Sequence, residues 1–356
     1  MADNGLTNDH ASNDNLMVLM DEELDQDDEF DLEYYLAAAD QAPLTSETMA
    51  AVVSDDGPTA SDELTALSNL PPALRSEFAA RWARLALARR RELINALGRL
   101  EDVEVVYTFG PIFYVALDDP DPAVRWEAIQ GLSHDTSQEV LEKLLPLARK
   151  PDPEVQPAAV EALASYAYQS SVGSLDGAAA ERLTETLHRL VQHEPFGSRV
   201  QLRAIESLAY LPDDPVADEY TERLYNEGGE EEQVAALIAM ARSLSPRWEA
   251  VVLDELDSES PRMRFHAAAA AGEMELADAI ERLGVVAAQD DDGEVRLAAI
   301  WALGEIEDPL STHILNRLLD TDDEETREAV EEALSHSHYW GAPIMKSATG
   351  EREAPE

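Results

Sequence analysis

The chain repeats one short helical segment along most of its length. In residues 290–308, apolar side chains recur at three- and four-residue steps, which is the spacing of a helix with one buried face. Residues 94–102 match residues 300–308 at most positions, and residues 121–129 match the first half of the segment. Because one such unit cannot cover its own apolar face, the copies have to stack on one another.

The spacing of the copies defines the size of the repeating unit. The position held by Arg296 recurs at eight places, which we call the ladder residues: Arg90, Arg125, Gln156, Gln201, Gln233, Arg264, Arg296 and Arg327. The intervals between them are 35, 31, 45, 32, 31, 32 and 31 residues. A period near 31 residues accommodates two short antiparallel helices with tight turns, the first of which carries the ladder residue. The sequence therefore predicts an all-α, right-handed α-solenoid of about seven two-helix repeats, with capping helices, over residues 68–338.

Acidic residues precede the predicted first helices. They include Asp119, Asp121, Asp152, Asp290, Asp291, Asp292, Asp322 and Asp323. A carboxylate is favoured at a helix N-terminus by the free N–H groups and the helix dipole. An arginine two or three positions into the helix can reach the acidic turn of a neighbouring repeat. We therefore interpret four arginines as a structural ladder rather than a phosphate site: Arg125, Arg264, Arg296 and Arg327.

The two ends of the chain differ from the repeats in composition. The net charge of −48 is uneven, because no Lys or Arg precedes Arg75 while acidic residues crowd positions 21–33. Such a segment repels itself and has few groups to bury, so residues 1–67 are predicted to be an acidic, mostly disordered tail, and residues 339–356 a second disordered tail. Two interpretations of the N-terminal tail remain open: it only keeps the protein in solution, or its apolar residues form a short motif that folds on a partner.

One basic cluster follows the acidic tail. Its members are Arg75, Arg81, Arg84, Arg89, Arg90, Arg91 and Arg99. One hypothesis is an intramolecular contact between the tail and this cluster, in competition with an external acidic partner such as RNA. The alternative is that each arginine is used within its own helix or against the repeat core. Nucleic acid is otherwise an unexpected partner for so acidic a chain.

Two groups of residues are candidates for binding another protein. The interval of 45 residues predicts an inserted loop over residues 166–177, which carries Tyr166 and Tyr168. The second helices of the repeats are expected to line the concave face of the solenoid. Exposed residues there form the other group of candidates: Tyr220, Arg223, Trp248, Arg282, His313 and Arg317.

Motifs that indicate catalysis or membrane insertion are absent from the sequence. The chain has no Cys, which excludes disulfides, thiolate nucleophiles and Cys-based zinc sites. It contains no Gly-rich phosphate loop, no nucleophile elbow of the G-x-S-x-G type and no H-E-x-x-H zinc motif. No apolar run approaches membrane-spanning length, and the N-terminus lacks the order of a signal peptide. We therefore predict a cytoplasmic protein without a catalytic site, cofactor, metal or membrane partner.

The repeat motif resembles that of the short HEAT-like repeats, the kind also found in phycobilisome lyases. The resemblance covers residues 71–335 and rests on Asp291 to Gly304 for the first helix and on Ile314 to Leu319 for the second. Residues 64–125 and 236–304 also resemble a family of uncharacterised bacterial HEAT-repeat proteins, which implies a shared cytoplasmic scaffold. The function expected from this resemblance is a non-catalytic scaffold whose concave face binds another protein.

The resemblance also leaves an enzymatic alternative open. Deoxyhypusine hydroxylases, another HEAT-like family, hold a di-iron site on His-Glu pairs directly after the repeat arginine. In this chain those positions hold Trp126 with Glu127, Phe265 with His266, Leu297 with Ala298, and Glu328 with Ala329. None of these is a His-Glu pair, so the ligands that iron needs are not grouped there. The alternative function is an enzyme or enzyme accessory of the bilin lyase type or the metal-dependent hydroxylase type.

Overall fold

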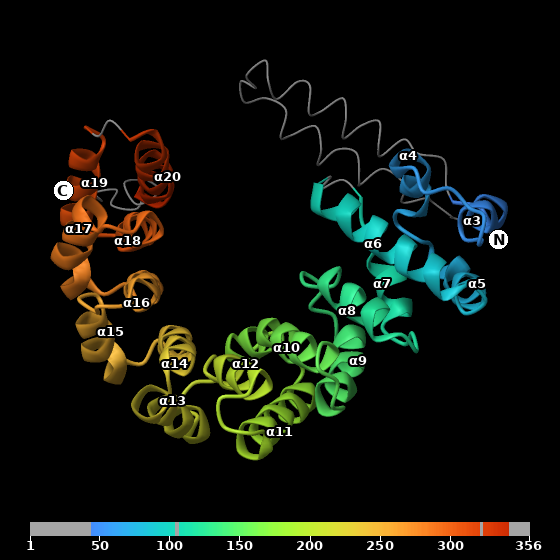
Figure 1. The fold of residues 1–356 in the computed structure, drawn as a ribbon, viewed down its shortest axis with the longest axis horizontal. Helices are drawn as coiled ribbons and strands as arrows, with labels where there is room; N and C mark the ends of the chain where they lie inside the picture. Colours follow the sequence, from blue (N-terminus) through green and yellow to red (C-terminus); the bar gives the residue numbers. More distant parts are fainter. Residues whose placement is uncertain (1–43, 104–106, 321–322, 342–356) are drawn as a thin grey trace, which may run out of the picture. The chain divides into compact units, whose positions relative to one another are not determined.

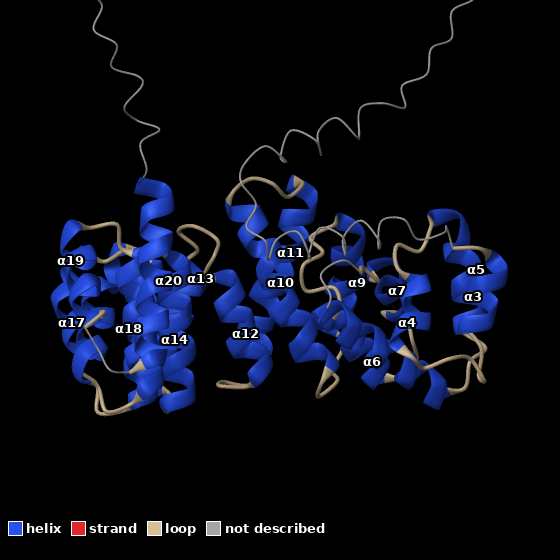
Figure 2. Ribbon diagram, turned by 90° about the horizontal axis from the view of Figure 1, so that it is seen from above, coloured by secondary structure: helices blue, strands red, loops and turns tan. Residues whose placement is uncertain are grey.

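The structure is a computed structural model that describes residues 44–103, 107–320 and 323–341. Across these ranges every regular element is a helix (Figure 2). The chain divides into two compact units, residues 1–134 and 135–356, and each is described by itself. Most of the two predicted tails, residues 1–43 and 342–356, lies outside the described residues.

The N-terminal unit contains short helices followed by the first copies of the repeat (Figure 1). Its elements are α3 (Ser46–Val52), α4 (Ser61–Leu64), the 3₁₀ helix η2 (Thr65–Leu67), α5 (Pro72–Trp82), α6 (Leu87–Val103), α7 (Gly110–Ala116) and α8 (Pro122–Gln130). Helices α6 and α8 carry Arg90 and Arg125 and pack against each other. Pro122 begins α8, where its missing N–H has no intrahelical acceptor, and the Asp121 side chain caps the same helix by accepting a hydrogen bond from the Val124 N–H.

Folded structure begins earlier than the predicted start at residue 68, so that boundary is wrong. Met49 and Val52 of α3 are 0% and 5% exposed. The Arg89 guanidinium, in a residue that is 4% exposed, donates hydrogen bonds to the carbonyl oxygens of Val52, Ser54 and Pro58 and ties this segment to α6. The acidic composition of this region predicts disorder. The segment nevertheless folds, because it buries a few apolar side chains and its carbonyl oxygens accept hydrogen bonds from one buried arginine.

The C-terminal unit is a stack of helix pairs in two layers (Figure 1). The first-helix layer consists of α10 (Val155–Ser171), α12 (Arg199–Leu208), α14 (Glu230–Ser243), α16 (Pro261–Glu273), α18 (Gly293–Glu305) and α20 (Glu324–Gly341), each of which carries one ladder residue. The second-helix layer consists of α9 (Gln138–Arg149), α11 (Gly177–His193), α13 (Pro215–Glu227), α15 (Glu249–Glu255), α17 (Ile280–Gln289) and α19 (Pro309–Leu318). The 3₁₀ turns η3 (Pro246–Trp248) and η4 (Ala277–Ala279) lead into α15 and α17. The predicted all-α stack of two-helix repeats is confirmed.

Neighbouring helices pack more closely in the first-helix layer than in the second-helix layer. Small residues permit this approach: a Cβ atom at Gly272 of α16 would lie 2.8 Å from the Cα atom of Ala302, and one at Gly304 of α18 would lie 2.9 Å from the Cβ atom of Ala333. The closely packed layer lies on the inner side of the curve that this unit follows in Figure 1. The prediction that the second helices line the concave face is therefore wrong for this unit.

The interval of 45 residues lengthens two helices instead of inserting a loop. Helices α10 and α11 have 17 residues each, and Tyr166 lies inside α10. This residue is 1% exposed, and its hydroxyl group is within hydrogen-bond distance of the carbonyl oxygens of Asp135 and Ser137, at 2.8 and 3.1 Å. Burial raises the pKa of the phenol. The predicted ligand role of Tyr166 is wrong, because its side chain joins α10 to the start of α9.

The last helix also extends past the predicted end of the solenoid at residue 338. Helix α20 runs to Gly341, so the sequence placed the start of the C-terminal tail too early. Val330 and Ala333 of α20 are buried, at 0% and 6% exposure, while Glu331 and Glu332 are exposed. One apolar side and one charged side are what the last helix of a stack needs.

Candidate protein-binding site

The ladder residues hold the turns of the stack. Each one from Arg90 to Arg296 donates a hydrogen bond to a main-chain carbonyl oxygen of the segment that precedes its own helix. Arg264 also forms two hydrogen bonds with the Asp290 carboxylate, at 2.7 and 2.8 Å, and so reaches the next repeat. Arg296 lies 4.0 Å from Asp323, and Arg327 lies 3.4 Å from Glu324 of its own helix. These contacts use the ladder arginines within the fold.

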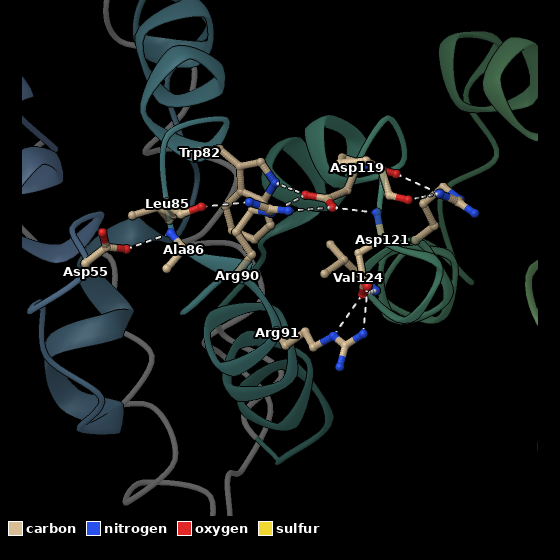
Figure 3. A network of polar contacts seen from close by, with 11 residues as sticks. Asp55, Trp82, Leu85, Ala86, Arg90, Arg91, Asp119, Asp121 and Val124 are labelled. Carbon is tan, nitrogen blue, oxygen red and sulfur yellow. Dashed lines mark hydrogen bonds and ion pairs between the residues drawn. The ribbon is translucent and has the colours of Figure 1, made fainter. Parts of the chain in front are cut away.

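The arginines around α6 are also used inside the fold (Figure 3). Arg90 forms an ion pair with Asp119 at 2.7 Å, and the same carboxylate accepts a hydrogen bond from the indole N–H of Trp82 at 2.8 Å. Arg91 donates two hydrogen bonds to Asp121, at 2.9 and 2.7 Å, which lowers the pKa of that carboxyl group.

Four of the seven arginines in the predicted basic cluster are paired within the fold, whereas Arg84 and Arg99 are exposed. In addition to Arg90 and Arg91, Arg89 is buried against main-chain carbonyl oxygens, and Arg81 pairs with Glu77 of its own helix at 2.9 Å. The alternative in which each arginine serves its own helix or the core describes these four. Residues 1–43, which the hypothesis places on the cluster, lie outside the described residues.

The contact residues predicted on the second helices are spread over the outer layer. Trp248 is only 5% exposed, and the Arg247 guanidinium lies 4.2 Å from the centre of its ring, so its predicted role as an exposed contact is wrong. The residue ends the 3₁₀ turn η3 directly before α15, and its large apolar side chain is buried there. Tyr220 of α13 is half-buried. Arg223 is exposed and donates a hydrogen bond to Glu227, at 2.9 Å.

The remaining predicted contacts lie on two further helices of this layer. Arg282 of α17 is exposed and donates a hydrogen bond to the Leu253 carbonyl oxygen at 2.5 Å. His313 and Arg317 are both exposed on α19. These residues are available to solvent, but they belong to different helices from the cluster that follows.

A cluster of charged and aromatic side chains lies on the first-helix layer. Its centre is Glu206 of α12, which is only 1% exposed. The Oε2 atom accepts a hydrogen bond from Arg203 at 2.6 Å and lies 3.6 Å from the guanidinium of Arg242 on α14. The Oε1 atom is buried without a hydrogen-bond partner. Burial raises the pKa of Glu206, and the attraction of Arg203 and Arg242 offsets only part of this effect.

Two tyrosines extend the cluster. The Arg242 guanidinium lies 5.1 Å from the centre of the Tyr210 ring, within the range of a cation–π contact. Tyr210 packs edge-to-face against Tyr168, with 5.8 Å between the ring centres. Tyr168 is 51% exposed near the end of α10. Of the residues predicted from the sequence as contacts, Tyr168 is the one that the structure places in this cluster.

The same layer carries three further groups on α16 and α18, of which His266 is half-buried and Glu273 and Trp301 are exposed. Burial, together with Arg262 and Arg203, lowers the pKa of His266. Desolvation by the neighbouring protein atoms raises the pKa of Glu273 against the opposing effect of Arg242, although the residue as a whole is exposed. Trp301 of α18 is 42% exposed. An exposed side chain in the middle of a first helix faces away from the second-helix layer, because the paired helix and the neighbouring repeats cover its other sides. Eight residues of this layer, of which three are exposed, four are half-buried and Glu206 is buried, are together called the inner face: Tyr168, Arg203, Glu206, Tyr210, Arg242, His266, Glu273 and Trp301.

The position five residues after the ladder residue differs between the first helices. Five positions after the ladder residue, α14, α16 and α18 carry Ile238, Ala269 and Trp301, whereas α10, α12 and α20 carry Glu161, Glu206 and Glu332. A carboxylate at this position therefore occurs in three of the six first helices, and Glu206 is the one of the three that is buried. Apolar spacing alone does not reveal it, because that spacing only separates the buried side of each helix from the rest.

Within the described ranges, no group of three or more His, Cys, Asp or Glu side chains is arranged to hold a metal ion. None of the helices in those ranges is both long and apolar enough to cross a bilayer. The inner face offers guanidinium and aromatic groups, which are common anchors of protein interfaces, beside several carboxylates.

Paired helices stacked in two layers define this protein as an α-solenoid. The family described as HEAT repeats matches residues 110–209 and 249–335, which together make up more than half of the chain. The protein belongs to the HEAT-repeat family. No curated protein sequence matches the chain.

Several solved structures share the helical repeat architecture at low sequence identity. Yeast importin-beta is 12% identical, with 84% of this chain and 46% of its own chain covered and a TM-score of 0.49. Human deoxyhypusine hydroxylase is 20% identical, with 87% of this chain and 98% of its own covered and a TM-score of 0.35. An engineered protein is 19% identical, with 78% and 84% covered and a TM-score of 0.37. The chain spans about half the length of the importin, and these likenesses concern the fold alone.

Proposed function

We propose that this protein is a non-catalytic scaffold that binds another protein on the inner face of its C-terminal unit. The observation that carries the proposal is Glu206. A buried carboxylate with one unpaired oxygen lowers the stability of a fold, and the next helix of the layer, α14, carries the apolar residue Ile238 at the equivalent position. Its contribution is to hold Arg203 and Arg242 in fixed orientations on the inner face, with Tyr210 and Tyr168 packed beside them.

Side chains held in this way suit protein recognition. Because their orientations are fixed before binding, they lose less conformational entropy when a partner docks. Arg and Tyr are enriched among the residues that dominate binding energy in interfaces, and stacked repeats present such residues over an extended surface. Nucleic acid fits less well, since a chain with a net charge of −48 repels phosphate groups. A cytoplasmic location is part of the proposal and agrees with a chain that has no Cys.

Affinity purification from the native host, followed by quantitative mass spectrometry, tests this function. The parent chain is compared with a variant that carries Tyr210→Ala and Arg242→Ala. The control carries Arg282→Ala and Arg317→Ala, which remove exposed arginines from the second-helix layer. We expect the partner to be lost from the first variant and retained by the control. Retention by both variants would contradict the proposal, and loss from the control alone would move the site to the outer layer.

The enzymatic alternatives need a separate measurement. Metal analysis of the purified parent chain distinguishes a scaffold from a metal-dependent hydroxylase, and incubation with a bilin and an acceptor protein distinguishes it from a bilin lyase. We expect neither stoichiometric iron nor transfer of the bilin to the acceptor. Either result would contradict a non-catalytic function.

A further inference from the structure

Trp301 is an aromatic residue of the inner face that is packed on one side and open elsewhere. It is 42% exposed, and a Cβ atom at Gly272 of α16 would lie 2.9 Å from its Cζ3 atom. The ring therefore lies against the glycine of the neighbouring helix, where a residue with a side chain would not leave room. This contact fixes the ring before any partner binds.

Carboxylates flank this ring on both helices. Glu305 follows Trp301 by four positions on α18, which places the two side chains on the same side of that helix. Glu273 directly follows Gly272 on α16. Both glutamates are exposed, and neither accepts a hydrogen bond or forms an ion pair in the described part of the chain, although Arg242 lies near enough to lower the pKa of Glu273.

We propose that Trp301, Glu273 and Glu305 form a binding subsite for a cationic side chain, Arg or Lys, of the partner protein. The inference rests on the proposed function and names the chemistry that the partner presents. A guanidinium or ammonium group over the open part of the indole is attracted by the ring, and the two carboxylates supply acceptors for its N–H donors. Ile238 and Ala269, at the same register as Trp301 on α14 and α16, extend the ring into a row of partly exposed apolar residues. The partner segment therefore combines basic with apolar residues.

The acidic character of the molecule does not by itself make this subsite. Carboxylates occur along the whole chain, which has 74 Asp and Glu residues, so a general attraction for cations has no preferred place. The combination of an open, fixed aromatic ring with unpaired carboxylates is what distinguishes Trp301. Tyr168, a second exposed aromatic residue of the inner face, lies beside the Tyr210 ring and the Arg242 guanidinium instead.

Binding of synthetic peptides to the full chain tests the subsite. Two fluorescein-labelled peptides share one pattern of Leu residues and carry either Arg or Glu at all other positions, and binding is followed by fluorescence anisotropy at about 0.15 M salt to screen surface charge. We expect the Arg peptide to bind and the Glu peptide not to bind. Trp301→Ala should raise the Kd of the Arg peptide by about threefold or more, and Trp301→Phe by less, because a phenyl ring keeps part of the cation–π attraction.

Charge-matched variants separate the subsite from general attraction. Glu273→Gln with Glu305→Gln should also raise the Kd, whereas Glu249→Gln with Glu281→Gln, which removes two exposed carboxylates from the second-helix layer, should leave it unchanged. Val285→Ala, at a residue that is 56% exposed on α17, is the apolar control for Trp301. Circular dichroism melts establish that each variant is folded.

Equal effects of the two glutamine pairs, or an unchanged Kd for Trp301→Ala in a folded chain, would overturn the subsite. Such a result would show that the peptide binds through charge alone. The proposed function fails on a different observation, namely retention of the partner by the Tyr210→Ala, Arg242→Ala variant in the purification. Loss of the partner from that variant, together with peptide binding that is independent of Trp301, would overturn only the subsite.

Discussion

Glu206 is buried with one unpaired oxygen, which lowers the stability of the fold, and its proposed role is to orient the arginines that bind a partner. Because burial raises its pKa above the ordinary 4.5, the folded chain binds this proton more tightly than the unfolded chain. Its contribution to the free energy of unfolding is therefore present below pH 4.5 and is lost as the pH rises through the folded-state pKa. We predict that Glu206→Leu is as stable as the parent chain at pH 7 or more stable by about 1–2 kcal/mol, and that its advantage is smaller at pH 4. Thermal melts followed by circular dichroism at several pH values measure this difference.

The control for this prediction is Glu305→Gln, which changes an exposed carboxylate of the same layer. It should show no comparable dependence on pH. If Glu206→Leu were several kcal/mol less stable than the parent chain at every pH, the ion pairs of Glu206 would mainly hold the fold together. The argument that this residue serves recognition would then be lost.

Removal of Arg264 is expected to destabilise the protein, because its hydrogen bonds to Asp290 join two neighbouring repeats. Arg264→Ala leaves the Asp290 carboxylate, whose side chain is 7% exposed, without its ion-pair partner, and should lower the free energy of unfolding by about 3 kcal/mol. Arg264 lowers the pKa of Asp290, so the stability from this pair is present above the ordinary value of 3.8 and is lost as the pH falls through the lowered pKa. Urea denaturation at pH 7 measures the loss. Arg282→Ala, at a side chain that is 44% exposed, should cost less than about 0.5 kcal/mol; similar losses for both would argue against a special role for the ladder.

At the level of helices, two glycines at the same place in the repeat differ in what surrounds them. A Cβ atom at Gly98 of α6 would meet nothing within 4 Å, whereas at Gly304 of α18 it would lie 2.9 Å from the Cβ atom and 3.1 Å from the Cα atom of Ala333. We predict that Gly98→Ala stabilises the protein by about 0.5–1 kcal/mol, because Ala favours the helix. Gly304→Ala should destabilise it by about 1–3 kcal/mol, because α18 and α20 must move apart. Urea titrations measure both signs, and a stabilising effect at Gly304 would contradict this packing of α18 on α20.

The repeat pattern predicts the helices but not the layer on which each surface lies. Apolar spacing and the ladder intervals are local properties, and they specify the helices, their buried sides and their pairing. Which layer is inner depends on the distance between neighbouring repeats, and that distance is set by small residues such as Gly272 and Ala302. The predicted contacts on the second helices therefore lie on the outer layer of the C-terminal unit instead of on its concave side. Glu206 and Arg242 were missed because packing brings them together from two helices that lie far apart in the sequence.

For the chain as a whole, the ends of the fold were the least predictable part. Composition placed the first boundary at residue 68, although α3 and α4 precede it, and the second at residue 338, inside α20. Both errors have one cause. A short helix in a charged segment folds when a few of its side chains pack against the rest of the protein, and the average composition of the segment does not reveal those few residues.

The earlier start of the fold leads to a prediction about truncated chains. A chain that starts at Asp62 lacks α3 and the carbonyl oxygens that accept hydrogen bonds from the buried Arg89, whereas a chain that starts at Leu44 keeps both. We predict that the shorter chain is less stable by about 1–3 kcal/mol for the unpaired guanidinium alone, with a further loss from the apolar surface that α3 covers. Differential scanning calorimetry compares the two chains. Equal unfolding temperatures would mean that residues 44–61 do not contribute to the fold.

The unequal packing of the two layers has a mechanical consequence for the C-terminal unit. Its first helices are in close contact through residues such as Gly272 and Gly304, while its second helices are further apart. When such a stack bends, the closely packed layer keeps nearly constant length, and the gaps between the second helices widen or narrow. We therefore expect the first-helix layer to resist stretching, and the second-helix layer to take up most of the change in length when the unit bends. A partner that binds along several inner helices, as we propose, would therefore change the curvature of the stack when it is placed under tension.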